Sequence, residues 1–277
     1  MNAETSPILT TLAMDHHNSG EIQGALRHHE LWPLVDAVPA VSKQLKSAIS
    51  GWVGESGTDP FPVVGGDSFD LGFLLRVFMH QSADMQYLYA SHHLLRGHGG
   101  EIHGHLRTMI ENAGVAYRSR EDPKLGELYI SGQIREFRKR TPSGRILPPD
   151  DPLTERLNGL FAYCSKNIHS NFLSMYDRTK TDLSREGDRG HLQHVVRFQD
   201  VDPNDLVTLL RPALVLISVG VEALNVIAHG FQLPAEHPWF QDLGKLDAGR
   251  RACRDRYADI LLDGLDEEDT TEPDRAS

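Results

Sequence analysis

The sequence has few cysteines, which limits both disulfides and metal sites. Only two, Cys164 and Cys253, occur in 277 residues, and they do not form a CxxC pair. A disulfide framework or a thiolate-bound zinc site needs more cysteines at closer spacing. Both cysteines are therefore expected to be reduced packing residues.

Long hydrophobic runs are also missing. The longest apolar run, Ala213 to Val221, is followed at once by Glu222 and falls well short of the ~20 residues that span a bilayer. The first residues, MNAETSPILTTLAMD, place no basic residue ahead of a short apolar run, unlike a secretory signal peptide. We expect a soluble, cytoplasmic protein without a membrane partner.

Several catalytic motifs are absent from the chain. There is no GxxxxGK[ST], no GxSxG, no strand-linked GxGxxG and no HExxH. NTPase, α/β-hydrolase and dinucleotide-binding classes lose their usual sequence support. No cofactor is expected.

Negative charge is concentrated at one end. The formal net charge is −11, and the segment DGLDEEDTTEPDRAS at 263–277 holds seven acids and one arginine, which leaves −5 for the rest. Such a segment cannot bury enough apolar surface to offset its ordering entropy, so residues 264–277 are expected to be a disordered acidic tail. The mildly acidic body argues against a wholly basic nucleic-acid surface.

Apolar residues recur at helical spacing, whereas sustained alternation of period two is almost absent, and this predicts an all-α helical bundle. We expect one domain at 36–263, preceded by an irregular or helical segment at 1–35. HVVRFQ at 194–199 reads as a short strand without an evident partner. Helices are predicted at 36–53, 68–97, 101–118, 123–139, 152–177, 203–230 and 247–263, with those at 68–97, 101–118, 152–177 and 203–230 around the main core.

The helix at 152–177 carries the first candidate site. Ser165 and His169 lie one turn apart at the border of its apolar stripe, where side chains can reach both core and cleft. The alternative is structural: Ser165 bonds a backbone carbonyl one turn earlier, and His169 caps a neighbouring element.

Two other helices carry polar groups beside apolar faces. Arg107 and Glu111 stand one turn apart on 101–118, a pair that is ordinary if exposed but able to select an anionic ligand if buried. Pro212 is expected to bend or restart the helix at 203–230, and after it Glu222, Asn225 and His229 share a stripe with Ser218. That stripe faces either a thin strip of solvent or an internal ligand-binding cleft.

The histidine-rich segment HGGEIHGH offers His98, Glu101 and His105 on one potential face. A metal half-site is conceivable from these residue types. However, four glycines weaken a helix there and no ExxH pair supports it, so a surface or interhelical cluster is preferred and no metal is expected.

YCSKNIHSN, which contains Ser165 and His169, resembles the Y-x-(L)-S-x-x-x-H-(P/S) signature, with an optional Leu, of bacterial helical proteins related to the HEPN superfamily. HLRTMIENAGVAY, with Arg107 and Glu111, resembles the R-x-x-x-E helix that precedes it there. The resemblance implies a compact, often dimeric helical bundle from phage-defence or toxin systems. Active members cleave RNA without metal through R-x(4–6)-H, but the three positions where that arginine would stand hold Ala162, Tyr163 and Cys164.

Two functional hypotheses follow. The first is a ligand-binding or sensor/scaffold module linked to phage defence. The alternative is a HEPN-like metal-independent ribonuclease or nucleotide-transfer toxin, acting on RNA or a nucleotide, in which His169 moves the proton and Arg107 stabilises phosphate charge. If a shared site exists, His169 should approach Arg107 or Glu111, and one residue of the Glu222 stripe should line the same cavity.

Overall fold

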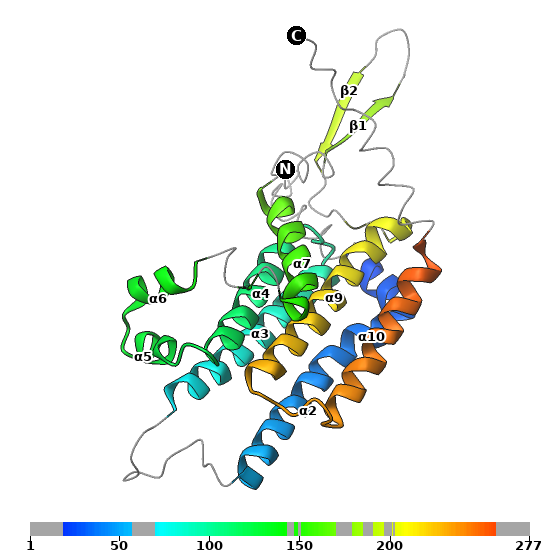
Figure 1. Cartoon of the computed structure of the whole chain (residues 1–277). Helices are drawn as coiled ribbons and strands as arrows, with labels where there is room; N and C mark the ends of the chain where they lie inside the picture. The colour runs from blue at the N-terminus through cyan, green and yellow to red at the C-terminus, as the bar shows by residue number, and fades with distance from the viewer. Residues whose placement is uncertain are drawn as a thin grey trace, which may run out of the picture.

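The computed structural model describes residues 19–56, 70–142, 147–148, 151–169, 179–184, 191–196, 201 and 203–258. Of residues 51–56, 169, 179–184 and 191–196 it describes the backbone alone. The predicted acidic tail and the first 18 residues lie outside this part of the chain. Within it, the protein is the all-α bundle that the apolar periodicity predicts (Figure 1).

Residues 19–28 are helical and precede the labelled elements. In chain order these are α2 (Trp32–Ser56), α3 (Leu71–Leu95), α4 (Ile102–Arg118), α5 (Lys124–Ile130), α6 (Ile134–Arg140), α7 (Pro152–His169), β1 (Thr179–Ser184), β2 (His191–Val196), α9 (Leu206–Gly230) and α10 (Trp239–Arg256).

Helix α9 is the centre of the bundle. It packs against α2, α3, α4, α7 and α10, and because it has neighbours on most sides, most of its residues are apolar and buried (Figure 1). Of the described helices it is also the one long and apolar enough to cross a membrane, but 61% of its most apolar window is buried within the protein. Burial in the bundle accounts for that composition equally well.

The start of α9 differs from the prediction. The Asp205 side chain accepts a hydrogen bond from the Val207 N–H and caps the helix, so the helix begins at Leu206 and not at 203. Pro212 lies inside one continuous helix and does not restart it.

Helices α3 and α4 form a helical hairpin on one side of α9, and α7 packs across α4 and α9. The Asp70 side chain caps the start of α3 by accepting a hydrogen bond from the Phe73 N–H. Gly97, just after the end of α3, adopts a positive φ of 81° that lets the chain leave the helix. Helices α2 and α10 cover the other side of α9. The Trp239 indole N–H donates to the Val41 carbonyl at 2.9 Å and joins them.

Three predicted helices have other boundaries. The segment 123–139 is split into α5 and α6 because Gly132 turns the chain with a φ of 72°. Helix α2 begins at Trp32 instead of 36, and α10 begins at Trp239, directly after Pro238, instead of 247.

The strand predicted at 194–199 overlaps β2. Its partner is β1, with Thr179 opposite Val196 and Ser184 opposite His191 in an antiparallel hairpin. Helix α7 ends at His169, and the last part of the helix predicted at 152–177 lies outside the described residues.

Candidate functional site

Arg107 and Glu111 form the ion pair that their spacing predicts. Arg107 Nε lies 3.5 Å from Glu111 Oε1, and both side chains are partly buried on α4. The Arg107 guanidinium also lies over the Phe161 ring of α7, 5.2 Å from its centre. The pair therefore faces α7.

Ser165 lies one turn beyond Phe161 on α7. Its hydroxyl is enclosed and makes no hydrogen bond with the described part of the chain, so the carbonyl bond considered as its structural role is not made. The side chain of His169, the last residue of α7, lies outside the described residues, and its approach to Arg107 stays a prediction.

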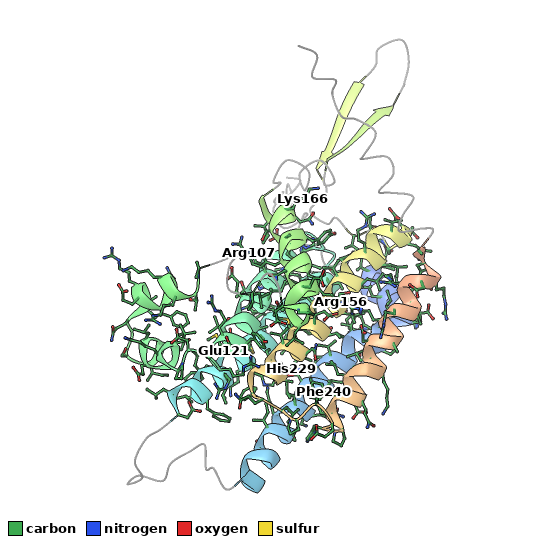
Figure 2. All side chains as sticks on the ribbon, in the orientation of Figure 1. Arg107, Glu121, Arg156, Lys166, His229 and Phe240 are labelled. Carbon is green, nitrogen blue, oxygen red and sulfur yellow. The ribbon has the colours of Figure 1, made fainter. Side chains whose placement is uncertain are left out.

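The Glu222 stripe lies between α7 and α10, where Glu222 is buried at 8% exposure and Asn225 and His229 are partly buried. Arg156, on α7, donates to Glu222 at 3.3 Å and is itself 64% exposed. His229 Nδ1 lies 2.9 Å from the Asn225 carbonyl oxygen, and its ring packs on Phe240 of α10. Figure 2 shows Arg107 to the left of α7 and Arg156 to its right, with His229 lower down beside Phe240. These contacts point to different neighbours and do not bring the predicted residues into one pocket.

Two members of the predicted group, His98 and His105, contact His93 at the end of α3, which the prediction did not include. The rings of His93 and His105 stack at 5.1 Å, and His105 Nδ1 lies 2.8 Å from Gln86 Oε1. Burial, and then the neighbouring His105 and His98, lower the pKa of His93. Among the described residues, no group of three or more His, Cys, Asp or Glu side chains is arranged to hold a metal ion.

The structure reveals a polar cluster between α2 and α3 that sequence reasoning missed. The Ser42 hydroxyl donates to Asp84 Oδ1 at 2.5 Å and lies 2.8 Å from His80 Nε2. Lys46 Nζ contacts the other oxygen of Asp84 at 2.5 Å. The sequence pattern that could have indicated this cluster is the i,i+4 spacing of Ser42 with Lys46 and of His80 with Asp84.

This cluster contains serine, histidine and aspartate but cannot act as a nucleophilic triad in this arrangement. The Ser42 hydroxyl donates its hydrogen bond to Asp84, so its oxygen can only accept a hydrogen bond from His80 Nε2–H. His80 is therefore a hydrogen-bond donor to Ser42, whereas a triad requires it to be the base that accepts the serine proton. Both Ser42 and His80 are 2% exposed. Burial lowers the pKa of His80 to about 4, so the ring is neutral at pH 7. The cluster fastens α2 to α3.

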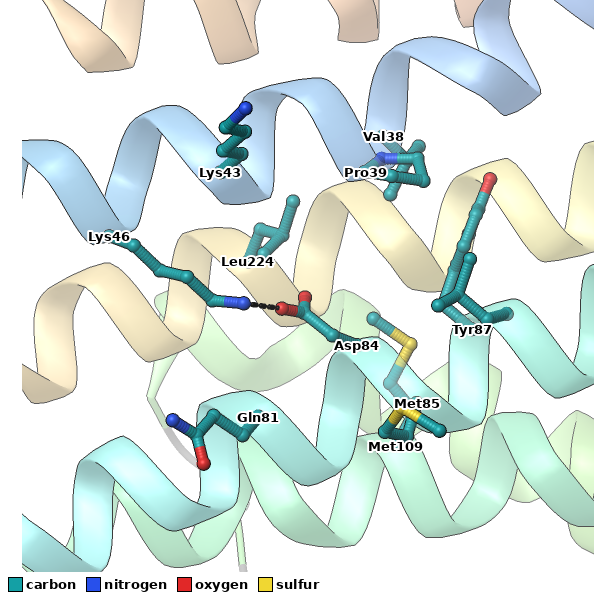
Figure 3. Close-up of a pocket in the computed structure, with 11 residues that line it drawn as sticks. Val38, Pro39, Lys43, Lys46, Gln81, Asp84, Met85, Tyr87, Met109 and Leu224 are labelled. Carbon is teal, nitrogen blue, oxygen red and sulfur yellow. Dashed lines mark ion pairs between the residues drawn. The ribbon is translucent and has the colours of Figure 1, made fainter.

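A groove lies between α2 and α3 beside this cluster (Figure 3). Its volume is about 560 Å³, and Lys43 and Lys46 stand on its α2 side. Its deepest residues, Val38, Met109 and Leu224, are almost closed to solvent. Both walls reach solvent: Lys43 and Lys46 are exposed on the α2 side, and on the α3 side the apolar Met85 and Leu88 are 45% and 50% exposed.

The groove continues into an exposed apolar surface, here called the α3 outer face, which consists of Phe78, Met85, Leu88 and Tyr89. These four account for half of the large apolar side chains that are exposed among the described residues. Several exposed apolar side chains gathered on one helix are typical of protein interaction sites. Helix α3 is thus apolar on two sides, since its opposite side packs in the core.

Comparison with protein-family models, with curated proteins and with solved structures found no match to this chain.

Proposed function

We propose that this protein is a scaffold or sensor module that binds an amphipathic helix along the α3 outer face and the adjoining groove. The observation that carries the proposal is the exposure of Met85 and Leu88, at 45% and 50%, on a helix whose other side is already packed. Helix-in-groove recognition uses apolar anchors at helical spacing in this way.

The chemistry of the neighbouring polar cluster favours binding over catalysis. Ser42 and His80 are sealed from solvent and satisfy each other, which leaves Asp84 and Lys46 as the members that reach the groove. A lysine and an aspartate at the rim can orient a bound helix through its polar flank.

Affinity capture followed by direct titration tests the proposal. Proteins retained by the full chain are purified, and their binding is measured by calorimetry with wild type and with Leu88→Glu. A charge at an apolar anchor is expected to weaken binding at least about tenfold. Leu206→Glu, which changes a 43% exposed leucine on α9, is the matched control and should bind like wild type. Equal binding by Leu88→Glu would contradict the proposal.

A second candidate is the HEPN-like ribonuclease or nucleotide-transfer activity in phage defence. It is supported by the packing of α4 on α7, which sets Arg107 against Phe161, one turn before Ser165. This activity predicts RNA cleavage or nucleotide transfer that persists in a chelator and is lost in both Arg107→Ala and His169→Ala. Unchanged RNA and nucleotides after incubation with wild type would remove it.

A further inference from the structure

Helix α3 carries a second, outward apolar stripe with coiled-coil spacing. Its members recur at alternating intervals of three and four residues, the a and d positions of a heptad pattern. We call this stripe the α3 seam; its residues are Phe78, Gln81, Met85, Leu88, His92 and Leu95. All but the partly buried Leu95 are exposed, whereas the opposite stripe, Leu75, Met79, Ala83, Ala90 and Leu94, is buried in the core.

We infer that the helix bound by the α3 seam is the α3 seam of a second copy of this chain, packed antiparallel about a twofold axis. This rests on the proposed function, because it names the occupant of the same docking surface. An interface made by one patch on both copies must be self-complementary. The α3 seam meets that requirement in a single register.

The register sets Met85 opposite Leu88 of the second copy. It then also sets Phe78 opposite Leu95, and Gln81 opposite His92. Apolar residues thus meet apolar residues, and each amide meets an imidazole with which it can exchange a hydrogen bond. A parallel pair would instead set His92 against His92 and align the two helix dipoles, which antiparallel packing opposes.

Charge does not oppose the pairing. No residue of the α3 seam is an acid, a lysine or an arginine. Asp84, which flanks it, is already paired with Lys46 of the same chain. Like-charge repulsion, which commonly excludes a second copy from an interface, is therefore absent along the facing positions.

The available area indicates a reversible dimer. Large side chains cover about 150 to 250 Å² when fully buried, and the four members of the α3 outer face are 38 to 50% exposed. With the polar residues of the α3 seam, this gives roughly 500 Å² per copy, or about 1,000 Å² in total, near the lower limit of specific interfaces. The dimer is expected to dissociate on dilution through the micromolar range.

Sedimentation equilibrium of the full chain tests the association. Between about 1 and 100 µM, a span that brackets micromolar dissociation, the wild-type mass should rise from monomer toward dimer. Leu88→Glu should weaken dimerisation at least tenfold, and the control Leu206→Glu should dimerise like wild type. The inference would be overturned if the wild-type mass stayed monomeric throughout, or if both variants lost dimerisation to the same extent.

Disulfide trapping tests the register. When Met85→Cys and Leu88→Cys proteins are mixed and mildly oxidised, a disulfide should join the two variants, while neither variant alone should cross-link efficiently. The native Cys164 and Cys253 are buried and serve as internal negative controls. Cross-linking of each variant with itself would show parallel packing and contradict the register.

The outcomes separate this inference from the proposed function. If Leu88→Glu loses a different purified partner while wild type stays monomeric, the docking surface stands and the second copy is wrong as its occupant. If Leu88→Glu neither loses a partner nor changes the mass of the protein in solution, both proposals fail.

Discussion

His80 shows how one buried side chain links pH to stability. Between its usual pKa of 6.5 and its lowered pKa of about 4, the unfolded chain takes up a proton at this ring that the folded chain does not. The contribution of His80 to the free energy of unfolding is therefore complete above pH 6.5 and is lost as the pH falls toward 4. The cause is burial, which disfavours the charged imidazole more than Asp84 favours it.

We predict that His80→Gln flattens this dependence. Glutamine keeps a side-chain N–H donor for Ser42 but does not titrate, so the fall in unfolding free energy from pH 7 to pH 4 should be smaller by on the order of 2 kcal/mol. Urea denaturation at several pH values measures this change in unfolding free energy. The same slope in the variant and in wild type would refute the assignment.

Gly220 lies where α9 packs tightly against α2 and α3. A Cβ atom there would lie 2.8 Å from both Tyr87 Cε2 and Val38 Cγ1. We predict that Gly220→Ala lowers the free energy of unfolding by about 1 to 3 kcal/mol, because the core must shift to admit a methyl group. Gly244→Ala on α10 is the control: nothing lies within 4 Å of the added atom, so helix propensity should stabilise the variant by about 0.5 to 1 kcal/mol. Equal midpoints in denaturant would contradict the packing argument.

At the scale of elements, a proline in α2 creates the polar contact that ties α2 to α3. Pro39 has no N–H, so the Val35 carbonyl lacks its partner one turn later. The buried Tyr87 hydroxyl donates to that carbonyl at 3.0 Å and replaces the missing bond. Burial also raises the pKa of Tyr87 well above 10, which keeps the hydroxyl protonated as a donor.

A double-mutant cycle tests this coupling. Tyr87→Phe should cost about 1 to 3 kcal/mol, because it leaves a buried carbonyl unpaired. In a Pro39→Ala background, the restored N–H satisfies Val35, and the same change should cost clearly less. Denaturant titration of the four proteins gives the coupling energy. A Tyr87→Phe cost that is independent of residue 39 would show that the hydroxyl serves another purpose.

At the scale of the whole molecule, the α3 outer face remains exposed in the assembled bundle. Helix α9 fills the centre, α4 covers one side of α3, and the Ser42–His80 contact fastens α2 to the other. On the remaining side of α3, Phe78 packs against Tyr129 of α5, while Met85 and Leu88 stay 45% and 50% exposed. If the inferred pairing occurs, the two copies close this surface and the mouth of the groove together.

Sequence reasoning predicted the fold class and most helices because helical periodicity is a local property of the chain. It failed at Gly132, which splits a predicted helix, and it did not decide between a bend and a restart at Pro212, because the effect of one glycine or proline on a helix depends on its surroundings. It directed attention to Arg107 and Glu222, which the structure places in contacts with different partners. His105, by contrast, contacts His93 of α3, which agrees with the interpretation of the histidine-rich segment as an interhelical cluster.

The sequence alone determined that this chain is helical and where the apolar stripes of several helices lie. Only the tertiary structure decided which stripe of α3 is buried, because that choice depends on helices remote in sequence competing for the same apolar surface. The contacts of Ser42 with His80 and of Tyr87 with the Val35 carbonyl were decided in the same way. Each joins residues from two helices whose relative position and rotation no local pattern specifies.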